Sequence, residues 1–221
     1  MRRPGWSNFG LVVAVAVSVA AITSGFAPAA AADGCPDVQL IFARGTAEPP
    51  GLGAVGDALF AALRPALGER SVDAYPVNYP ASYNFLTTAD AANDARDHIA
   101  AMADQCPATR LVLGGFSQGA AAVSMLAGVP PIGQRIGNFG SAPALDPGLA
   151  DKVRAVAVFG NPGNRFNTPL SSTGAFAGRA IDLCSAGDPV CVVGGRDRDA
   201  HHDYESPPYP AQATGFIAGL V

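Results

Sequence analysis

Short apolar runs alternate with segments of helical spacing along most of this chain, and this alternation limits the folds open to it. The short apolar runs are predicted strands: residues 38–43, 72–79, 110–113, 153–159 and 180–183. The segments with helical spacing are predicted helices: residues 53–64, 88–103, 118–127 and 211–220. Strands separated by helices favour a parallel sheet covered on both faces. We therefore expect one α/β domain with a central, mainly parallel five-stranded sheet and no large lid.

Two prolines sharpen this picture of the elements. Pro65 would end the helix that begins at residue 53, because proline cannot donate the backbone hydrogen bond of a helix interior. Pro76 lies inside a predicted strand and would remove a hydrogen bond from the ladder. We therefore expect the strand over residues 72–79 to lie at an edge of the sheet.

The first 32 residues are expected to form a secretory signal peptide rather than part of the fold. They combine a basic start at Arg2, an apolar run over residues 11–22 and a run of alanines that ends at Ala32. The run is short for a membrane-spanning helix, and an uncleaved anchor is the alternative. Cleavage near Ala32 would leave residues 33–221 as one domain, secreted to the extracellular space or the cell envelope.

Four cysteines follow the expected cleavage site, at Cys35, Cys106, Cys184 and Cys191. An even number of cysteines in an exported chain implies disulfides, and four allow three connectivities. We expect Cys35 to pair with Cys106, which ties the start of the domain to the end of a helix. Cys184 and Cys191 would then close a short loop. A zinc site is not favoured because the spacing contains no CxxC pair, and no metal is expected.

The charge of the chain excludes one class of partner. Only 14% of the residues are charged, and the formal net charge is −4. No basic face for nucleic acid emerges from the sequence, so no nucleic-acid partner is expected. No apolar stretch after the leader is long enough to span a membrane. We expect a monomer.

A GxSxG motif over residues 115–119 joins a predicted strand to a predicted helix. In a nucleophile elbow the serine sits on a sharp, strained turn, and side chains at Gly115 or Gly119 would crowd that turn. The turn would place the Ser117 hydroxyl at the N-terminus of a helix, where the helix dipole favours developing negative charge. Ser117 is therefore a candidate nucleophile. A glycine-rich turn capped by serine is the structural alternative.

A serine nucleophile requires an adjacent base, and the chain has three histidines. In α/β-hydrolases the catalytic residues follow the order serine, acid, histidine along the chain. His98 precedes Ser117 and lies at the margin of an apolar helix face, which favours a packing role. His201 and His202 lie in a polar loop near the C-terminus. Neighbouring side chains on an extended loop point in different directions, so only one of the two can face Ser117.

The acid should lie between Ser117 and His201. Asp188 is favoured because it follows a predicted strand and would be held still by the short disulfide loop. Asp182 is expected within the strand, whereas Asp197 and Asp199 alternate with arginines as solvated loop charges. The remaining aspartates in this interval are Asp146 and Asp151.

Four segments of the chain resemble the cutinase family, in the order in which that family has them. They are Ala43-Arg44-Gly45-Thr46-Ala47-Glu48, Gly114-Gly115-Phe116-Ser117-Gln118-Gly119-Ala120-Ala121, Cys184-Ser185-Ala186-Gly187-Asp188-Pro189-Val190-Cys191 and Ala200-His201-His202-Asp203-Tyr204. The four cysteines match as well. The resemblance implies a secreted serine esterase with an α/β-hydrolase fold.

The resemblance also implies roles for particular residues. His201 becomes the base because it stands three positions before Tyr204, and Asp188 becomes the acid. The oxyanion hole would use the backbone N–H groups of Thr46 and Gln118. Family members often have serine at the position of Thr46, and threonine keeps both the N–H and a hydroxyl. No metal or organic cofactor is expected.

The expected substrates are short- to medium-chain esters, polyesters or lipids. Tyr83, Phe85 and Leu86 precede a helix and could form an apolar rim that contacts lipid or polymer surfaces, although ordinary core packing would also explain them. An acetylxylan esterase is the alternative within the same reaction class. A secreted binding protein with a decayed site is the alternative outside it. The natural substrate is left open.

Overall fold

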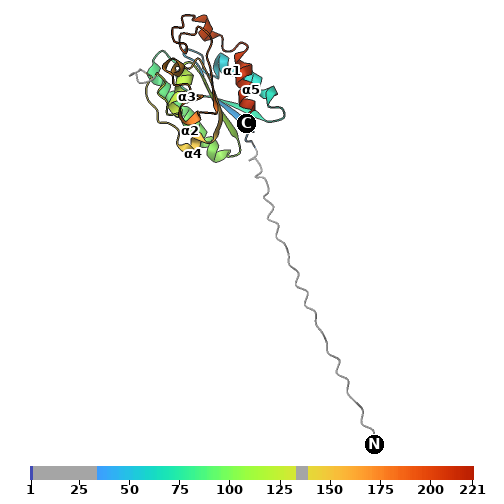
Figure 1. Ribbon diagram of the computed structural model, residues 1–221. Helices are drawn as coiled ribbons and strands as arrows, with labels where there is room; N and C mark the ends of the chain where they lie inside the picture. The colour runs from blue at the N-terminus through green and yellow to red at the C-terminus, as the bar shows by residue number, and fades with distance from the viewer. Residues whose placement is uncertain (2–33, 133–138) are drawn as a thin grey trace. The chain divides into compact units, whose positions relative to one another are not determined.

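The computed structural model describes residues 34–132 and 139–221, together with Met1. The predicted signal peptide therefore lies outside the described residues, Met1 excepted. The described ranges form a sheet with helices packed on its two faces (Figure 1).

The sheet has five strands, all parallel, in the order β2-β1-β3-β4-β5. The strands are β1 (Val38–Ala43), β2 (Val72–Pro76), β3 (Arg110–Phe116), β4 (Val153–Phe159) and β5 (Ala180–Leu183). The predicted parallel five-stranded sheet is confirmed. All five carboxyl ends lie at one edge of the sheet, which is where parallel α/β sheets place their binding sites.

Alternating side chains of each strand build two separate cores. On β1, Leu40 and Phe42 pack toward one pair of helices, whereas Ile41 and Ala43 pack toward the other pair. The first pair is α1 (Gly53–Ala66) and α5 (Tyr209–Ala218), and the second is α2 (Thr88–Gln105) and α3 (Gln118–Leu126). The shorter helices are α4 (Pro147–Ala150), η1 (Phe85–Thr87), η2 (Pro162–Phe166), η3 (Gly174–Phe176) and η4 (Asp199–His202). Burial on both faces explains why β1, β3 and β4 read as near-continuous apolar runs, whereas the edge strand β2 is only partly buried.

Several element boundaries differ from the sequence-based prediction by a few residues, and three of them involve proline or glycine. Helix α1 includes Pro65 in its last turn, because Leu67 N–H still donates to Leu63 O at 3.0 Å around the missing bond. Strand β3 continues through Gly114 to Phe116. Glycine at residue 114 leaves the space that the Phe42 ring of β1 occupies, so β1 and β3 can stay paired there. Strand β2 ends at Pro76, and it lies at the sheet edge as predicted.

Both predicted disulfides are present. Cys35 and Cys106 join the segment before β1 to the end of α2, and Cys184 and Cys191 close the loop that follows β5. A bridge over 71 residues restricts the unfolded chain strongly, and in the chain-entropy model it contributes about 4 kcal/mol. Among the described residues, no helix has both the length and the apolar character needed to cross a bilayer.

Candidate active site

Ser117 lies on the turn between β3 and α3, in a backbone conformation that few residues adopt. Its φ is 53° and its ψ is −110°. A Cβ atom at Gly119 would lie 1.9 Å from Ala43 O, and one at Gly115 would lie 2.5 Å from the Gly119 carbonyl carbon. Glycine at both positions is therefore a steric requirement of the turn. The Ser117 N–H donates to Phe159 O at 2.9 Å, which fixes the strained residue against β4.

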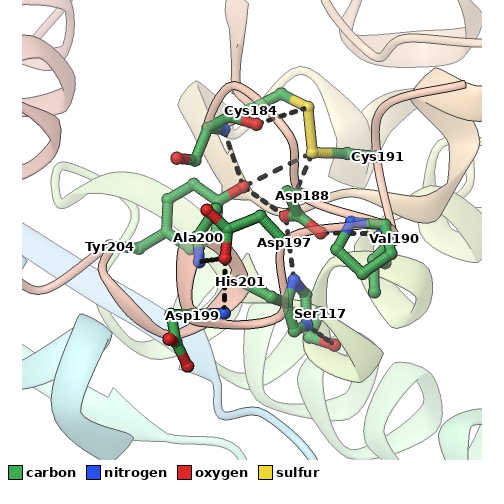
Figure 2. Close-up of polar contacts among 12 residues, drawn as sticks. Ser117, Cys184, Asp188, Val190, Cys191, Asp197, Asp199, Ala200, His201 and Tyr204 are labelled. Carbon is green, nitrogen blue, oxygen red and sulfur yellow. Dashed lines mark hydrogen bonds and ion pairs between the residues drawn. A yellow bond between two sulfur atoms is a disulfide. The ribbon is translucent and has the colours of Figure 1, made fainter. Parts of the chain in front are cut away.

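A histidine and an aspartate from the segment after β5 extend a line of contacts from this serine. His201 Nε2 lies 2.9 Å from Ser117 Oγ, and His201 Nδ1 lies 2.8 Å from Asp188 Oδ2 (Figure 2). The imidazole therefore bridges a hydroxyl and a carboxylate. His201 belongs to the short helix η4 rather than to the extended loop expected from the sequence.

The Asp188 carboxylate is fully buried and has three hydrogen-bond donors. Besides the His201 ring, Oδ2 accepts the Tyr204 hydroxyl, and Oδ1 accepts the Val190 N–H at 2.7 Å (Figure 2). Burial raises the pKa of Asp188, but the hydrogen bonds from His201 and Tyr204 outweigh it, so the pKa lies below its ordinary value. The carboxylate is therefore ionised at neutral pH and holds the imidazole in one orientation.

Tyr204 is a member of this group to which the sequence analysis gave no role. Its hydroxyl also accepts the Ser185 N–H at 2.9 Å, and its side chain has no solvent exposure. Burial and the neighbouring Asp188 carboxylate both raise the pKa of Tyr204, which keeps the hydroxyl protonated as a donor. The sequence did contain a signal for this role of Tyr204. It lies three residues after His201, and both side chains bond to the Asp188 carboxylate.

The other histidines and aspartates occupy different surroundings. His202 is exposed, with its ring 5.7 Å from the His201 ring, and it lies at the margin of the site. His98 stacks on Tyr75 at 3.5 Å, in agreement with the expected packing role. Asp182 accepts hydrogen bonds from Asn161 and from the Ser171 N–H, and Asp197 accepts the N–H groups of Asp199 and Ala200. Asp146 precedes α4, and Asp151 faces Arg179 at 3.9 Å.

Thr46 and Gln118, the predicted oxyanion-hole residues, line the same cavity as Ser117. Gln118 begins α3, where the first N–H groups of a helix have no intrahelical partner. Thr46 lies in the loop that follows β1. In the two described ranges, neither the Thr46 N–H nor the Gln118 N–H has a hydrogen-bond acceptor. The Thr46 hydroxyl donates to Gln118 Oε1 at 3.0 Å, and the Gln118 amide donates to Thr88 Oγ1 at 3.1 Å, so side chains tie the loop to α3 and α2.

A cavity of about 290 Å³ opens over the Ser117 hydroxyl. Of the predicted rim residues, Tyr83 and Phe85 line it, whereas Leu86 is exposed and is not among its lining residues. The other residues that line it beside the predicted site residues come from segments far apart in the chain, which no local pattern connects: Phe116, Phe139, Pro162, Val190 and His202. The walls are therefore mainly apolar. No group of side chains suited to a metal ion occurs within residues 34–132 and 139–221.

Comparison with known proteins places these features in one family. A family model described as Cutinase matches residues 34–221. A protein of Mycobacterium tuberculosis named Probable carboxylesterase Culp3 is 46% identical over 217 residues, which cover 97% of this chain and 80% of that protein. Phospholipase Culp4 of the same organism is 45% identical over 212 residues, with coverage of 96% and 90%.

Solved structures agree with this grouping. A Trichoderma reesei cutinase in complex with a C11Y4 phosphonate inhibitor has a TM-score of 0.66 and 30% identity, and the match covers 84% of this chain and 77% of that one. The catalytic core domain of acetyl xylan esterase from the same organism has a TM-score of 0.72 and 24% identity, with coverage of 85% and 100%. The second likeness concerns the fold alone.

Proposed function

The chain belongs to the cutinase family and is a serine esterase, and from that premise we propose that it hydrolyses carboxylic esters through an acyl-enzyme on Ser117. One observation carries the proposal. An unbroken set of hydrogen bonds runs from Ser117 Oγ through His201 to the buried, ionised Asp188. This arrangement supplies the nucleophile, the base and the group that orients the base.

In the first half of the proposed reaction, the Ser117 oxygen attacks the ester carbon while His201 Nε2 takes the hydroxyl proton. Negative charge develops on the former carbonyl oxygen, and the Thr46 and Gln118 N–H groups stabilise it by about 3 kcal/mol each. Asp188 stabilises the imidazolium without taking up the proton itself. His201 then protonates the leaving alcohol, which departs and leaves an acyl group on Ser117.

In the second half, water takes the place of the alcohol. His201 removes a proton from the water, whose oxygen attacks the acyl carbon. The same two amides hold the second oxyanion, and collapse of this intermediate releases the carboxylic acid and restores the Ser117 hydroxyl. Every group in this scheme comes from the chain, so the proposed reaction requires no metal or organic cofactor.

The character of the cavity supports short- to medium-chain acyl groups, polyesters or lipids as substrates. Its walls are mainly apolar, and Tyr83 at its rim has 78% of its surface exposed. An exposed aromatic side chain beside an apolar opening suits contact with a lipid or polymer surface. The relatives named carboxylesterase and phospholipase fit the same reaction class. An acetylated sugar would gain little from these walls.

We also propose that residues 1–32 direct export and are removed, leaving a monomeric enzyme that acts outside the cell or in the cell envelope. The two disulfides support this, because such bridges persist in oxidising compartments. Protein recovered from the culture medium should therefore begin near Asp33, as N-terminal sequencing would show. Accumulation of the full chain inside the cell would contradict the proposal.

A series of p-nitrophenyl esters from acetate to palmitate tests the proposed substrate class on the purified mature protein. We expect kcat/KM to be highest between butyrate and octanoate, because the apolar walls gain contact with each added methylene until the chain leaves the cavity. A fluorophosphonate probe should label the wild type at Ser117. A strong preference for acetate would favour the acetylxylan esterase alternative, and absence of labelling would favour the decayed binding protein.

A further inference from the structure

The loop after β1 satisfies each of its backbone N–H groups from residue 45 to residue 48, with one exception. The Gly45 N–H donates to Glu48 Oε2 at 2.5 Å, the Ala47 N–H to Ala81 O at 2.6 Å and the Glu48 N–H to Gly45 O at 3.4 Å. Among the described hydrogen bonds, only the Thr46 N–H lacks an acceptor. The direction of the Thr46 N–H is therefore set by the hydrogen bonds of Gly45 and Ala47 on either side of it, because the Thr46 N–H makes none.

The Glu48 carboxylate bridges this loop and a helix. Its second oxygen, Oε1, accepts the Ala54 N–H at 2.8 Å in the first turn of α1. The N-terminus of a helix favours a negative charge, which gives the carboxylate a fixed anchor. Gly53 leaves the space for this contact, because a Cβ atom there would lie 2.4 Å from Glu48 Oε2. The position of Gly45, next to Thr46, is thereby coupled to α1.

The rest of the loop is braced around a strained residue. Ala47 has a φ of 64°, a conformation that persists only where neighbouring contacts enforce it. The buried Arg44 guanidinium donates to Glu48 O at 2.9 Å and to Tyr79 O at 2.6 Å. The Arg44 bonds join the two ends of the loop to each other and to Tyr79. The Glu48 carboxylate adds a bond within the loop, to the Gly45 N–H.

We propose that Glu48 is a positioning residue that aims the Thr46 N–H at the carbonyl oxygen of the substrate. The inference rests on the proposed function, since it assigns a task to that amide. An amide that stabilises the oxyanion acts mainly in the transition state, so its misalignment lowers kcat with little change in KM. A purely structural carboxylate would instead change stability and leave the kinetics of the folded enzyme unaltered.

The test is Glu48→Gln in the mature protein with both disulfides intact. The Gly45 and Ala54 N–H groups meet different oxygens of Glu48, and in glutamine one of these oxygens becomes an NH₂ group, which cannot accept a hydrogen bond. We expect kcat for p-nitrophenyl butyrate to fall about tenfold, with KM unchanged within about twofold. The rate of inactivation by a p-nitrophenyl phosphonate should fall by a similar factor, because that reaction also develops an oxyanion.

Asp37→Asn is the matched control. Asp37 Oδ2 accepts the Ser71 N–H at 2.7 Å and the Ser71 hydroxyl at 2.8 Å, so it also joins two segments through a carboxylate, but at the opposite end of the strands. This variant should keep the wild-type kcat even where thermal unfolding shows lost stability. Comparison of the two variants therefore separates positioning of the amide from general support of the fold.

The outcomes divide clearly. A folded Glu48→Gln enzyme with wild-type kcat and phosphonate reactivity would overturn the inference while leaving the esterase assignment intact. If this variant fails to fold, Glu48→Asp takes its place under the same criterion, because its shorter side chain cannot span both N–H groups. A wild type that hydrolyses no ester would instead refute the proposed function itself.

Discussion

Replacement of Ser117 by alanine is expected to lower kcat for p-nitrophenyl butyrate by about a million-fold. The Ser117 Oγ atom, 2.9 Å from His201 Nε2, is the nucleophile in the proposed reaction, and alanine offers no atom to form the acyl-enzyme. The remaining groups can still bind ester and polarise its carbonyl, so a small residual rate above that of water is expected. Initial rates at high enzyme concentration measure the loss, and the fluorophosphonate probe should no longer label the protein.

The fold of this variant should survive, because the Ser117 hydroxyl contacts only the His201 ring in the described hydrogen bonds. Ser124→Ala is a matched control on α3, the helix that follows Ser117. Its buried hydroxyl donates to Ala120 O at 3.1 Å and does not line the cavity. Ser124→Ala should retain activity. Undiminished turnover in folded Ser117→Ala would refute the assignment of the nucleophile.

Replacement of Gly160 by alanine is expected to reduce kcat/KM roughly 100-fold, because an ångström of misplacement in a catalytic group has consequences of this order. Gly160 follows β4 and lies beneath the imidazole. A Cβ atom there would lie 2.9 Å from His201 Cε1 and 3.2 Å from Asp188 Oδ2. We expect the ring to move away from Ser117, because the Gly160 N–H is tied to Leu183 O at 2.9 Å and holds the backbone in place. Steady-state kinetics with p-nitrophenyl butyrate would measure the effect.

Backbone strain alone could also harm this variant, since Gly160 has a φ of 56°. Gly178→Ala controls for that strain. Gly178 has a φ of 82°, and a Cβ atom there would meet nothing within 4 Å. Both variants should lose stability in urea unfolding, but Gly178→Ala should keep its activity. Equal kcat/KM in the two folded variants would show that the contact with His201 is unimportant.

Two kinds of feature could be predicted from the sequence. The first is periodic. Buried parallel strands require continuous apolar runs and the helices between them require their own spacing, so the five strands could be located before the structure was known. The second is local. Gly115 and Gly119 satisfy a steric requirement of the turn at Ser117. Cys184 and Cys191 are only seven residues apart, so their bridge could also be expected from local spacing.

Element ends were harder to predict because neighbours in space decide them. Gly114 and Gly115 look like a strand stop, yet they extend β3, since their missing side chains make room for the Phe42 ring and for the backbone of Gly119. Pro65 looks like a helix stop, yet α1 includes it because the Leu67 N–H still donates to Leu63 O and closes the last turn. Helix and strand propensities are properties of single residues, whereas the end of an element depends on contacts made by the whole turn.

By itself, then, the sequence determined the order of strands and helices, the sharp turn at Ser117 and the short list of residues that could serve it. Residue spacing left the two adjacent histidines open, and the family resemblance selected His201 and Asp188. Only the tertiary structure showed these two side chains meeting at Ser117 and decided which loops enclose the cavity. The physical reason is the parallel sheet, which brings the carboxyl ends of β1, β3, β4 and β5 to one edge. The loops that follow these strands therefore lie close together, but the sequence pattern within one loop does not predict which other loops it contacts.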